Sequence, residues 1–202
     1  MSAPADGYYT DERWQNWLDR LRDEDLDPED EDAARLLWNL QEDAAIAVVK
    51  IISEYDDEEL DAEMTMNELA NVREIVLADV DIDDEETLLL IDGVQTSLVC
   101  VFYAAELYVA EGVADADVAE CLRAAEAAEA EEEFDDALAH CARAGTLLID
   151  GAELDRSVID DVGYGPVAEW LNGLGSLESA LSDPELIEED EDEDEDEDAD
   201  SD

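Results

Sequence analysis

Apolar residues are concentrated in one long run near the middle of the chain, from Thr87 to Ala110 (TLLLIDGVQTSLVCVFYAAELYVA). They lie on every side of a helical wheel, which is typical of a helix that other parts of a protein surround. Asp92 and Glu106 interrupt the run and no basic residues flank it, so the pattern does not favour a membrane span. With Asp83 as its N-cap and Gly112 after its end, the run predicts a central, buried helix.

Apolar positions also repeat with helical spacing in the first part of the chain. They predict helices over 11–22, from Pro28 to about Tyr55, and over 62–78. Between 76 and 82 the apolar residues alternate as well, so the pattern leaves helix and strand open there. Two sets of small residues would let the second helix approach the central one closely: Ala44, Ala45 and Ala47 on the second helix, and Gly93, Ser97, Cys100 and Ala104 on the central one.

The first predicted helix carries two tryptophans, Trp14 and Trp17, in a single apolar stripe. One interpretation is that this stripe packs on the core. The alternative is a patch for a partner protein, because tryptophan is enriched at the energetic centres of protein interfaces. Both tryptophans are therefore candidate partner-binding residues.

Asp92 is the acid nearest the middle of the central apolar run. A buried carboxylate is costly unless a cation or hydrogen-bond donor answers it. Arg73 lies within the apolar stripe of the third predicted helix, so we expect Asp92 and Arg73 to form a buried polar pair, with Lys50 as the alternative cation.

The last part of the chain predicts more helices and then a tail. A helical hairpin is expected over 115–150, with Asp115 as its cap, then a short helical turn over 153–161 and a final helix from Pro166 to about Leu181. Beyond residue 188 the chain is almost purely Asp and Glu, and such a block has nothing to bury. The pattern predicts an all-α bundle of about six helices around the central one, organised as a flexible N-terminus (1–9), a single helical domain (10–184) and a disordered acidic tail (185–202).

The stretch EEFDDALAHCARAGTLLID, with Phe134 at the turn and Ala137 and Ala144 at small positions, resembles the second half of a tetratricopeptide repeat. The likeness covers about one repeat, residues 116–149, and such arrays need about three stacked units. It therefore implies a repeat-like α-hairpin and not a solenoid. Placed on the repeat template, three residues would line the concave, partner-binding side: Leu122, Glu126 and Glu129.

The charge balance is extreme: 64 acidic residues stand against 9 basic ones, for a net charge of −55. The acidity could attract a basic partner, or it could reflect life in molar salt. At molar salt the Debye length is only about 3 Å, so neighbouring surface carboxylates barely repel one another. Because the acids are spread over nearly every segment, and Lys50 is the only lysine, we favour a halophilic origin.

Three segments, YYTDERWQNWLDR, DGVQTSLVCVFYAAE and EWLNGLGSLESALSDPE, resemble an uncharacterised family of haloarchaeal proteins, a domain of unknown function. Together they span most of the predicted helical region. The resemblance implies an archaeal cytosolic protein, and it brings no activity, cofactor or catalytic residue.

No motif in the sequence points to catalysis, a metal or a cofactor. Asp79, Asp81 and Asp83 imitate the start of a calcium loop, but the glycine and glutamate that the loop needs are missing. There is one histidine, His140, and the three cysteines lack metal-ligand spacing, which is typical of buried thiols in a cytoplasmic protein. No signal peptide is visible. The excess of acids opposes direct nucleic-acid binding.

The sequence therefore favours a non-enzymatic interaction or adaptor protein of a halophilic archaeon, with an unknown protein partner and no membrane. The alternative is an acidic decoy or chaperone for basic ribosomal or chromatin proteins, acting through residues 188–202. A third hypothesis is an enzyme that uses a buried Asp92.

Overall fold

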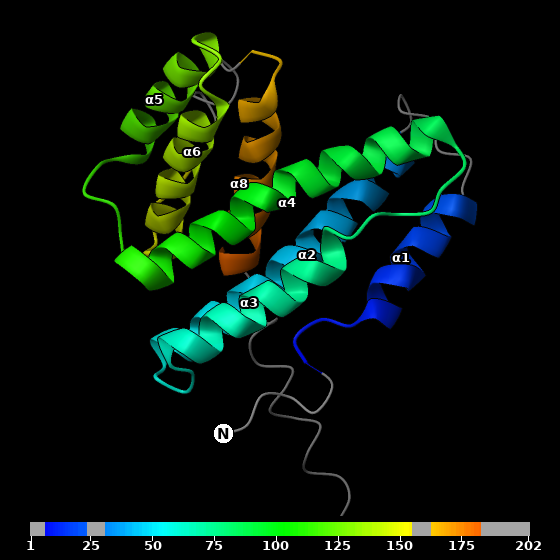
Figure 1. Cartoon of the computed structure of the whole chain (residues 1–202), viewed down its shortest axis with the longest axis horizontal. Helices are drawn as coiled ribbons and strands as arrows, with labels where there is room; N and C mark the ends of the chain where they lie inside the picture. The colour runs from blue at the N-terminus through cyan, green and yellow to red at the C-terminus, as the bar shows by residue number, and fades with distance from the viewer. Residues whose placement is uncertain (1–6, 24–30, 155–162, 183–202) are drawn as a thin grey trace, which may run out of the picture.

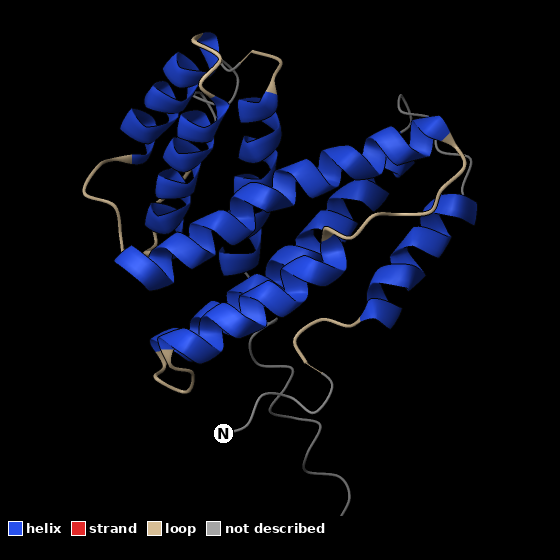
Figure 2. Ribbon diagram, viewed as in Figure 1, coloured by secondary structure: helices blue, strands red, loops and turns tan. Residues whose placement is uncertain are grey.

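The computed structural model describes residues 7–23, 31–154 and 163–182. These residues form seven helices and no strand (Figure 2), so the predicted all-α fold is confirmed. The predicted helix start at Pro28, most of the helical turn expected over 153–161, and the acidic tail lie outside the described residues. The helices are α1 (Asp11–Asp23), α2 (Glu31–Asp56), α3 (Ala62–Val76), α4 (Glu85–Glu111), α5 (Val118–Ala130), α6 (Phe134–Ile149) and α8 (Pro166–Ser182).

The central apolar run forms α4, which packs against α2, α3, α6 and α8. In Figure 1, α4 crosses the molecule between a group of α1, α2 and α3 and a group of α5, α6 and α8. The helix begins one residue later than predicted, because the carboxylate of Asp84, and not that of Asp83, accepts the Thr87 N–H at 2.8 Å. It ends at Gly112, whose φ of 80° favours glycine.

Burial of α4 is not complete. Leu89 is 69% exposed and Tyr103 is 41% exposed, while residues such as Leu98 and Phe102 are fully buried. By length and composition α4 could cross a membrane, but half of its most apolar window is buried inside the protein. A run that is apolar on all sides thus forms the core helix and still leaves part of one face open.

Two glycines let neighbouring helices approach α4 closely. A Cβ added to Gly173 of α8 would lie 2.1 Å from the Ser97 carbonyl oxygen, and one added to Gly145 of α6 would lie 2.4 Å from the Ala104 Cβ. No larger residue fits at either point without moving a helix. The predicted contact of α2 with α4 is confirmed, but Ser97 and Ala104, from the small-residue line of α4, meet α8 and α6.

Of the ambiguous stretch 76–82, Val76 ends α3, and residues 77–84 form neither a helix nor a strand. Two of their backbone carbonyls accept hydrogen bonds from side chains: Gln95 Nε2 donates to Ala78 O at 2.9 Å, as it does to Val76 O at the end of α3, and Arg22 donates to Asp81 O at 2.8 Å. Alternating apolar residues need a neighbouring strand to form a sheet, and the described part of the chain offers none.

The predicted hairpin is present as α5 and α6, which pack against each other. Its first cap is Asp117 and not Asp115, because Asp117 and Glu120 form a reciprocal capping box. Glu132, with a φ of 61°, lies in the turn between the helices. Several acids precede α4 and α5, so the start of each can shift by a residue or two without losing its cap.

Candidate interaction surface

The two tryptophans of α1 lie in different environments. Trp14 is only 2% exposed and belongs to the hydrophobic core together with Leu18 and Leu21. The candidate role of Trp14 in partner binding is therefore wrong, because α1 turns this side chain toward the protein. Trp17 is half-buried, and its indole N–H donates to Asp43 Oδ2 at 2.8 Å.

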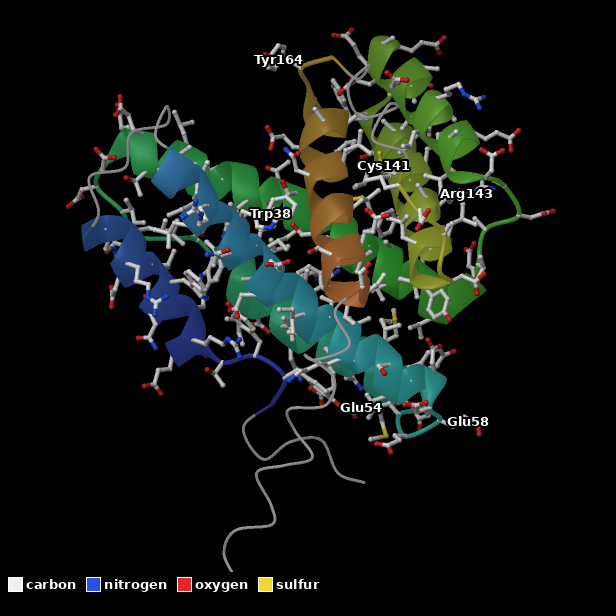
Figure 3. The ribbon with its side chains drawn as sticks, turned by 180° about the vertical axis from the view of Figure 1, so that it is seen from behind. Trp38, Glu54, Glu58, Cys141, Arg143 and Tyr164 are labelled. Atoms are coloured by element: carbon white, nitrogen blue, oxygen red, sulfur yellow. The ribbon has the colours of Figure 1, made fainter. Side chains whose placement is uncertain are left out.

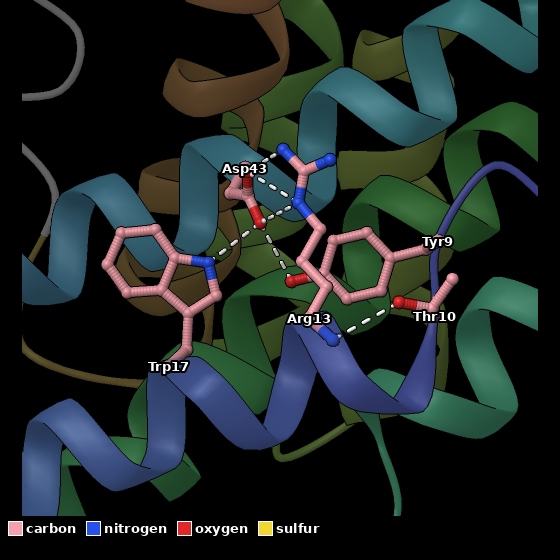
Figure 4. Close-up of polar contacts among 5 residues, drawn as sticks. All are labelled: Tyr9, Thr10, Arg13, Trp17 and Asp43. Atoms are coloured by element: carbon pink, nitrogen blue, oxygen red, sulfur yellow. Dashed lines mark hydrogen bonds and ion pairs between the residues drawn. The ribbon is translucent and has the colours of Figure 1, made fainter.

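Asp43 of α2 gathers several donors from the N-terminal segment (Figure 4). Besides Trp17, it accepts the Tyr9 hydroxyl at 2.9 Å and the Arg13 guanidinium through Nε at 3.0 Å. Burial, and then the Asp43 charge, raise the pKa of Tyr9, and the hydrogen bond to Asp43 raises the pKa of Arg13. Tyr9 is buried, so part of the lead-in predicted to be flexible is packed. We call Tyr9, Arg13, Trp17 and Asp43 the Asp43 cluster, and it fastens α1 to α2.

The predicted pair of Asp92 and Arg73 does not form. Asp92 is exposed, and Arg73 pairs with Glu106 at 2.5 Å. The reason is the register of α3 on α4: Gln95 already reaches the end of α3 at Val76, so Arg73, one turn earlier, faces the C-terminal half of α4. Asp92 therefore does not offer the buried carboxyl that the catalytic hypothesis requires.

The hairpin residues assigned to a concave binding side are not left free on the surface. Leu122 is fully buried, which rules out its role as a contact residue, and Glu126 is half-buried. Glu129 Oε1 accepts the Val167 N–H at 2.9 Å, and a Cβ on Gly165 would lie 2.5 Å from the same oxygen. Glu129 thus supports the start of α8, where a carboxylate also favours the helix dipole.

The cysteines are buried free thiols, as the sequence predicted. Burial, and then the neighbouring thiol of Cys141 on α6, raise the pKa of Cys100 on α4 well above its ordinary value. Such thiols are poor nucleophiles. In the described ranges no group of three or more His, Cys, Asp or Glu side chains is arranged to hold a metal ion.

A groove that the sequence did not predict lies where the last turns of α4 meet α6. Its volume is about 480 Å³. The loop after α4 forms one wall and is tied to α6, because the Ala114 N–H donates to Thr146 Oγ1 at 3.1 Å. We call this the Tyr103 groove, and its lining residues include Tyr103, Leu107, Glu111, Val113, Asp115, Ala139 and Arg143.

The Tyr103 groove combines exposed apolar side chains with a cation. Tyr103 and Val113 are each 41% exposed, and Arg143 is exposed. No carboxylate among the described residues pairs with Arg143, whereas Arg13, Arg22 and Arg73 each have an acidic partner. Figure 3 shows Arg143 on α6 and Trp38 on α2. The sequence could not separate Tyr103 from its buried neighbours, because the run around it is apolar on all sides.

A larger groove of about 850 Å³ lies beside Trp38, which is 42% exposed, and the C-terminal half of α8. Its polar side chains already hold the protein together. Glu178 accepts the Leu154 N–H at 2.6 Å, and the Ser179 hydroxyl donates to Glu42 at 2.6 Å. This groove therefore offers fewer unused polar groups than the Tyr103 groove.

Most of the chain matches one known protein family. The model of a family described as uncharacterized proteins conserved in archaea (DUF2150) matches residues 7–190. The chain belongs to this family. The archaeal part of the predicted resemblance is thereby confirmed, while its restriction to haloarchaea and the likeness to a tetratricopeptide hairpin stay predictions. Searches among curated proteins and among solved structures give no match.

Proposed function

We propose that this member of the archaeal family is a non-enzymatic interaction or adaptor protein that binds a partner protein through the Tyr103 groove. One observation carries the proposal: exposed Tyr103 and Val113 share a groove with Arg143, which has no carboxylate partner in the described ranges. Tyrosine and arginine are enriched among the residues that dominate binding energy at protein interfaces. The remaining surface is mostly acidic, and scattered carboxylates discriminate poorly between partners.

The proposed setting is the cytoplasm of a halophile. A net charge of −55 strains a compact protein at low ionic strength, and molar salt relieves that strain. We therefore expect binding, helix content and the melting temperature to be highest in molar KCl. Equal helix content and melting temperature in dilute buffer would contradict this setting.

The test of the proposed function compares two alanine variants of α4. Tagged wild-type protein, Tyr103→Ala and Leu89→Ala are used to capture proteins from an archaeal lysate in molar KCl. Leu89 is the matched control, because it is more exposed than Tyr103, lies on the same helix and is outside the groove.

We expect one stoichiometric partner that the wild type and Leu89→Ala retain. Tyr103→Ala should lose it by at least about tenfold in affinity, the usual loss at an interface hot spot. If no stoichiometric partner is retained, or if both variants bind it equally, the Tyr103 groove is not the binding site.

The alternative function rests on a different part of the chain, the Asp- and Glu-rich residues 188–202. Such a block would bind basic proteins by charge, and molar salt would weaken that binding strongly. Deleting 188–202 should then abolish the capture of basic proteins and leave the Tyr103-dependent partner bound. If the deletion changes no capture, the decoy or chaperone hypothesis fails.

A further inference from the structure

We infer that the Tyr103 groove selects a partner segment in which a side-chain carboxylate stands next to a large apolar side chain, with Arg143 as the receptor for that carboxylate. The inference rests on the proposed function and names the chemistry of the partner. The apolar walls of the groove would hold the apolar side chain of the partner, and the guanidinium of Arg143 would bind the carboxylate next to it.

Arg143 is available for this role, whereas most other described cations have a partner. Arg13, Arg22 and Arg73 pair with acids, and Arg20 stacks on Trp17 at 5.0 Å. Arg143 is exposed and has no acidic partner within the described residues, although acids are seven times as common as bases in the chain. A guanidinium presents a planar fork of donors that matches a carboxylate in two-point contact.

The apolar walls of the groove set the second requirement. Tyr103 and Leu107 come from α4, Val113 comes from the loop, and Ala139 comes from α6. A volume of about 480 Å³ falls within the range of sites that bind ligands, and it can hold one large side chain and its flanking backbone. An apolar side chain that fills it would shield the contact between Arg143 and the carboxylate from water, which strengthens that contact.

The carboxylate is expected to come from a side chain and not from a chain terminus. Sites that capture a terminal carboxylate use clusters of unengaged backbone N–H groups. In the loop that forms one wall, the Gly112 N–H already donates to Tyr108 O at 2.9 Å, and the Ala114 N–H donates to Thr146 Oγ1. The guanidinium of Arg143 is thus the charged donor that the groove offers.

Long-range charge does not oppose an acidic segment under the proposed conditions. The net charge of −55 repels acids at low salt, but with a Debye length of about 3 Å in molar salt only groups in contact interact strongly. Glu111 and Asp115 also line the groove, so a long acidic run would meet them. The favoured segment therefore carries one carboxylate beside its apolar residue and not a block of acids.

The test is selection from a displayed library of random peptides against the full-length protein in molar KCl. Wild-type protein should enrich peptides that contain Asp or Glu next to a large apolar residue. Arg143→Gln should keep the apolar preference and lose the acidic one. Arg123→Gln is the matched control, because Arg123 is also exposed, lies on α5 and is outside the groove.

Three synthetic peptides then measure the effect: acetyl-Gly-Ser-Leu-Glu-Gly-amide, its Gln analogue, and acetyl-Gly-Ser-Leu with a free terminal carboxylate. Wild-type protein should bind the Glu peptide about tenfold more tightly than the other two, as for a charge-assisted hydrogen bond in a shielded site, and Arg143→Gln should bind all three equally.

If the wild-type protein selects apolar residues without acids, the inference is wrong and the proposed function stands. If the wild-type protein selects neither acids nor apolar residues, both the inference and the proposed function are wrong. Preference for the free terminal carboxylate, or an acidic preference that survives in Arg143→Gln, would also overturn the inference.

Discussion

The Asp43 cluster and the Tyr103 groove contain the same residue types, but the first holds two helices together and the second is open to solvent. In the Asp43 cluster, a tyrosine, an arginine and a tryptophan all donate to one carboxylate, and α1 is closed onto α2. In the Tyr103 groove, a tyrosine of α4 and an arginine of α6 line the same groove, but no carboxylate of the described residues pairs with the arginine. The comparison teaches that an aromatic residue and a cation mark a binding surface only where the protein itself does not supply their partner.

The largest effect is expected from removing the shared acceptor with Asp43→Ala. Buried Tyr9, half-buried Trp17 and exposed Arg13 lose their shared acceptor, and mainly because the buried Tyr9 hydroxyl is left unpaired, the free energy of unfolding should fall by about 2 kcal/mol. Urea denaturation in molar KCl measures the change. Asp19→Ala is the control, because the exposed Asp19–Arg22 pair on α1 should contribute less than about 0.5 kcal/mol. Equal losses would mean that the cluster does not hold α1.

A smaller effect is expected at alkaline pH. Burial and Asp43 raise the pKa of Tyr9 in the folded protein, whereas in the unfolded chain this phenol ionises near a pH of about 10. Deprotonation therefore favours unfolding, and the stability that the phenol contributes should be complete below a pH of about 10 and lost progressively above it. Urea denaturation between about pH 9 and pH 11 should show a steeper loss for the wild type than for Tyr9→Phe. Parallel curves would contradict the assignment.

The smallest effect on stability is expected in the Tyr103 groove. Arg143→Ala removes no internal ion pair, so the free energy of unfolding should change by less than about 0.5 kcal/mol, as for an ordinary surface substitution. Thermal unfolding followed by circular dichroism checks this. A large loss of stability would show that Arg143 supports the fold, and the contrast with the Asp43 cluster would disappear.

Most of the fold could be predicted from the helical periodicity of apolar residues. The stripes of α1, α2, α3 and α8 and the long run of α4 depend on local spacing, so the sequence could predict them. Cap positions shifted where several acids precede a helix, as with Asp84 and Asp117. Residues 77–84 depend on side chains from α1 and α4, which no local pattern contains.

The surface could not be predicted in the same way. A stripe indicates which residues share a face, but not which of them lies at its centre, so Trp14 and Trp17 looked alike. Leu122 is buried and Glu129 is engaged by the start of α8, because α5 packs against α6 and α8 in the folded protein. Tyr103, in contrast, stays partly exposed, because α6 contacts α4 at the next residue, Ala104.

The contact of Gly145 with Ala104 has a consequence for how a partner would be received. Ala104 follows Tyr103 in α4, and Gly145 lies two residues after Arg143 in α6, so the two helices that carry these groove residues are in close contact next to the groove. A methyl group added at Gly145 would not fit, so α4 and α6 pack here as closely as a glycine allows. A groove whose walls are already in place loses little conformational entropy when a partner binds. An acidic, heavily hydrated protein can therefore still bind a partner selectively.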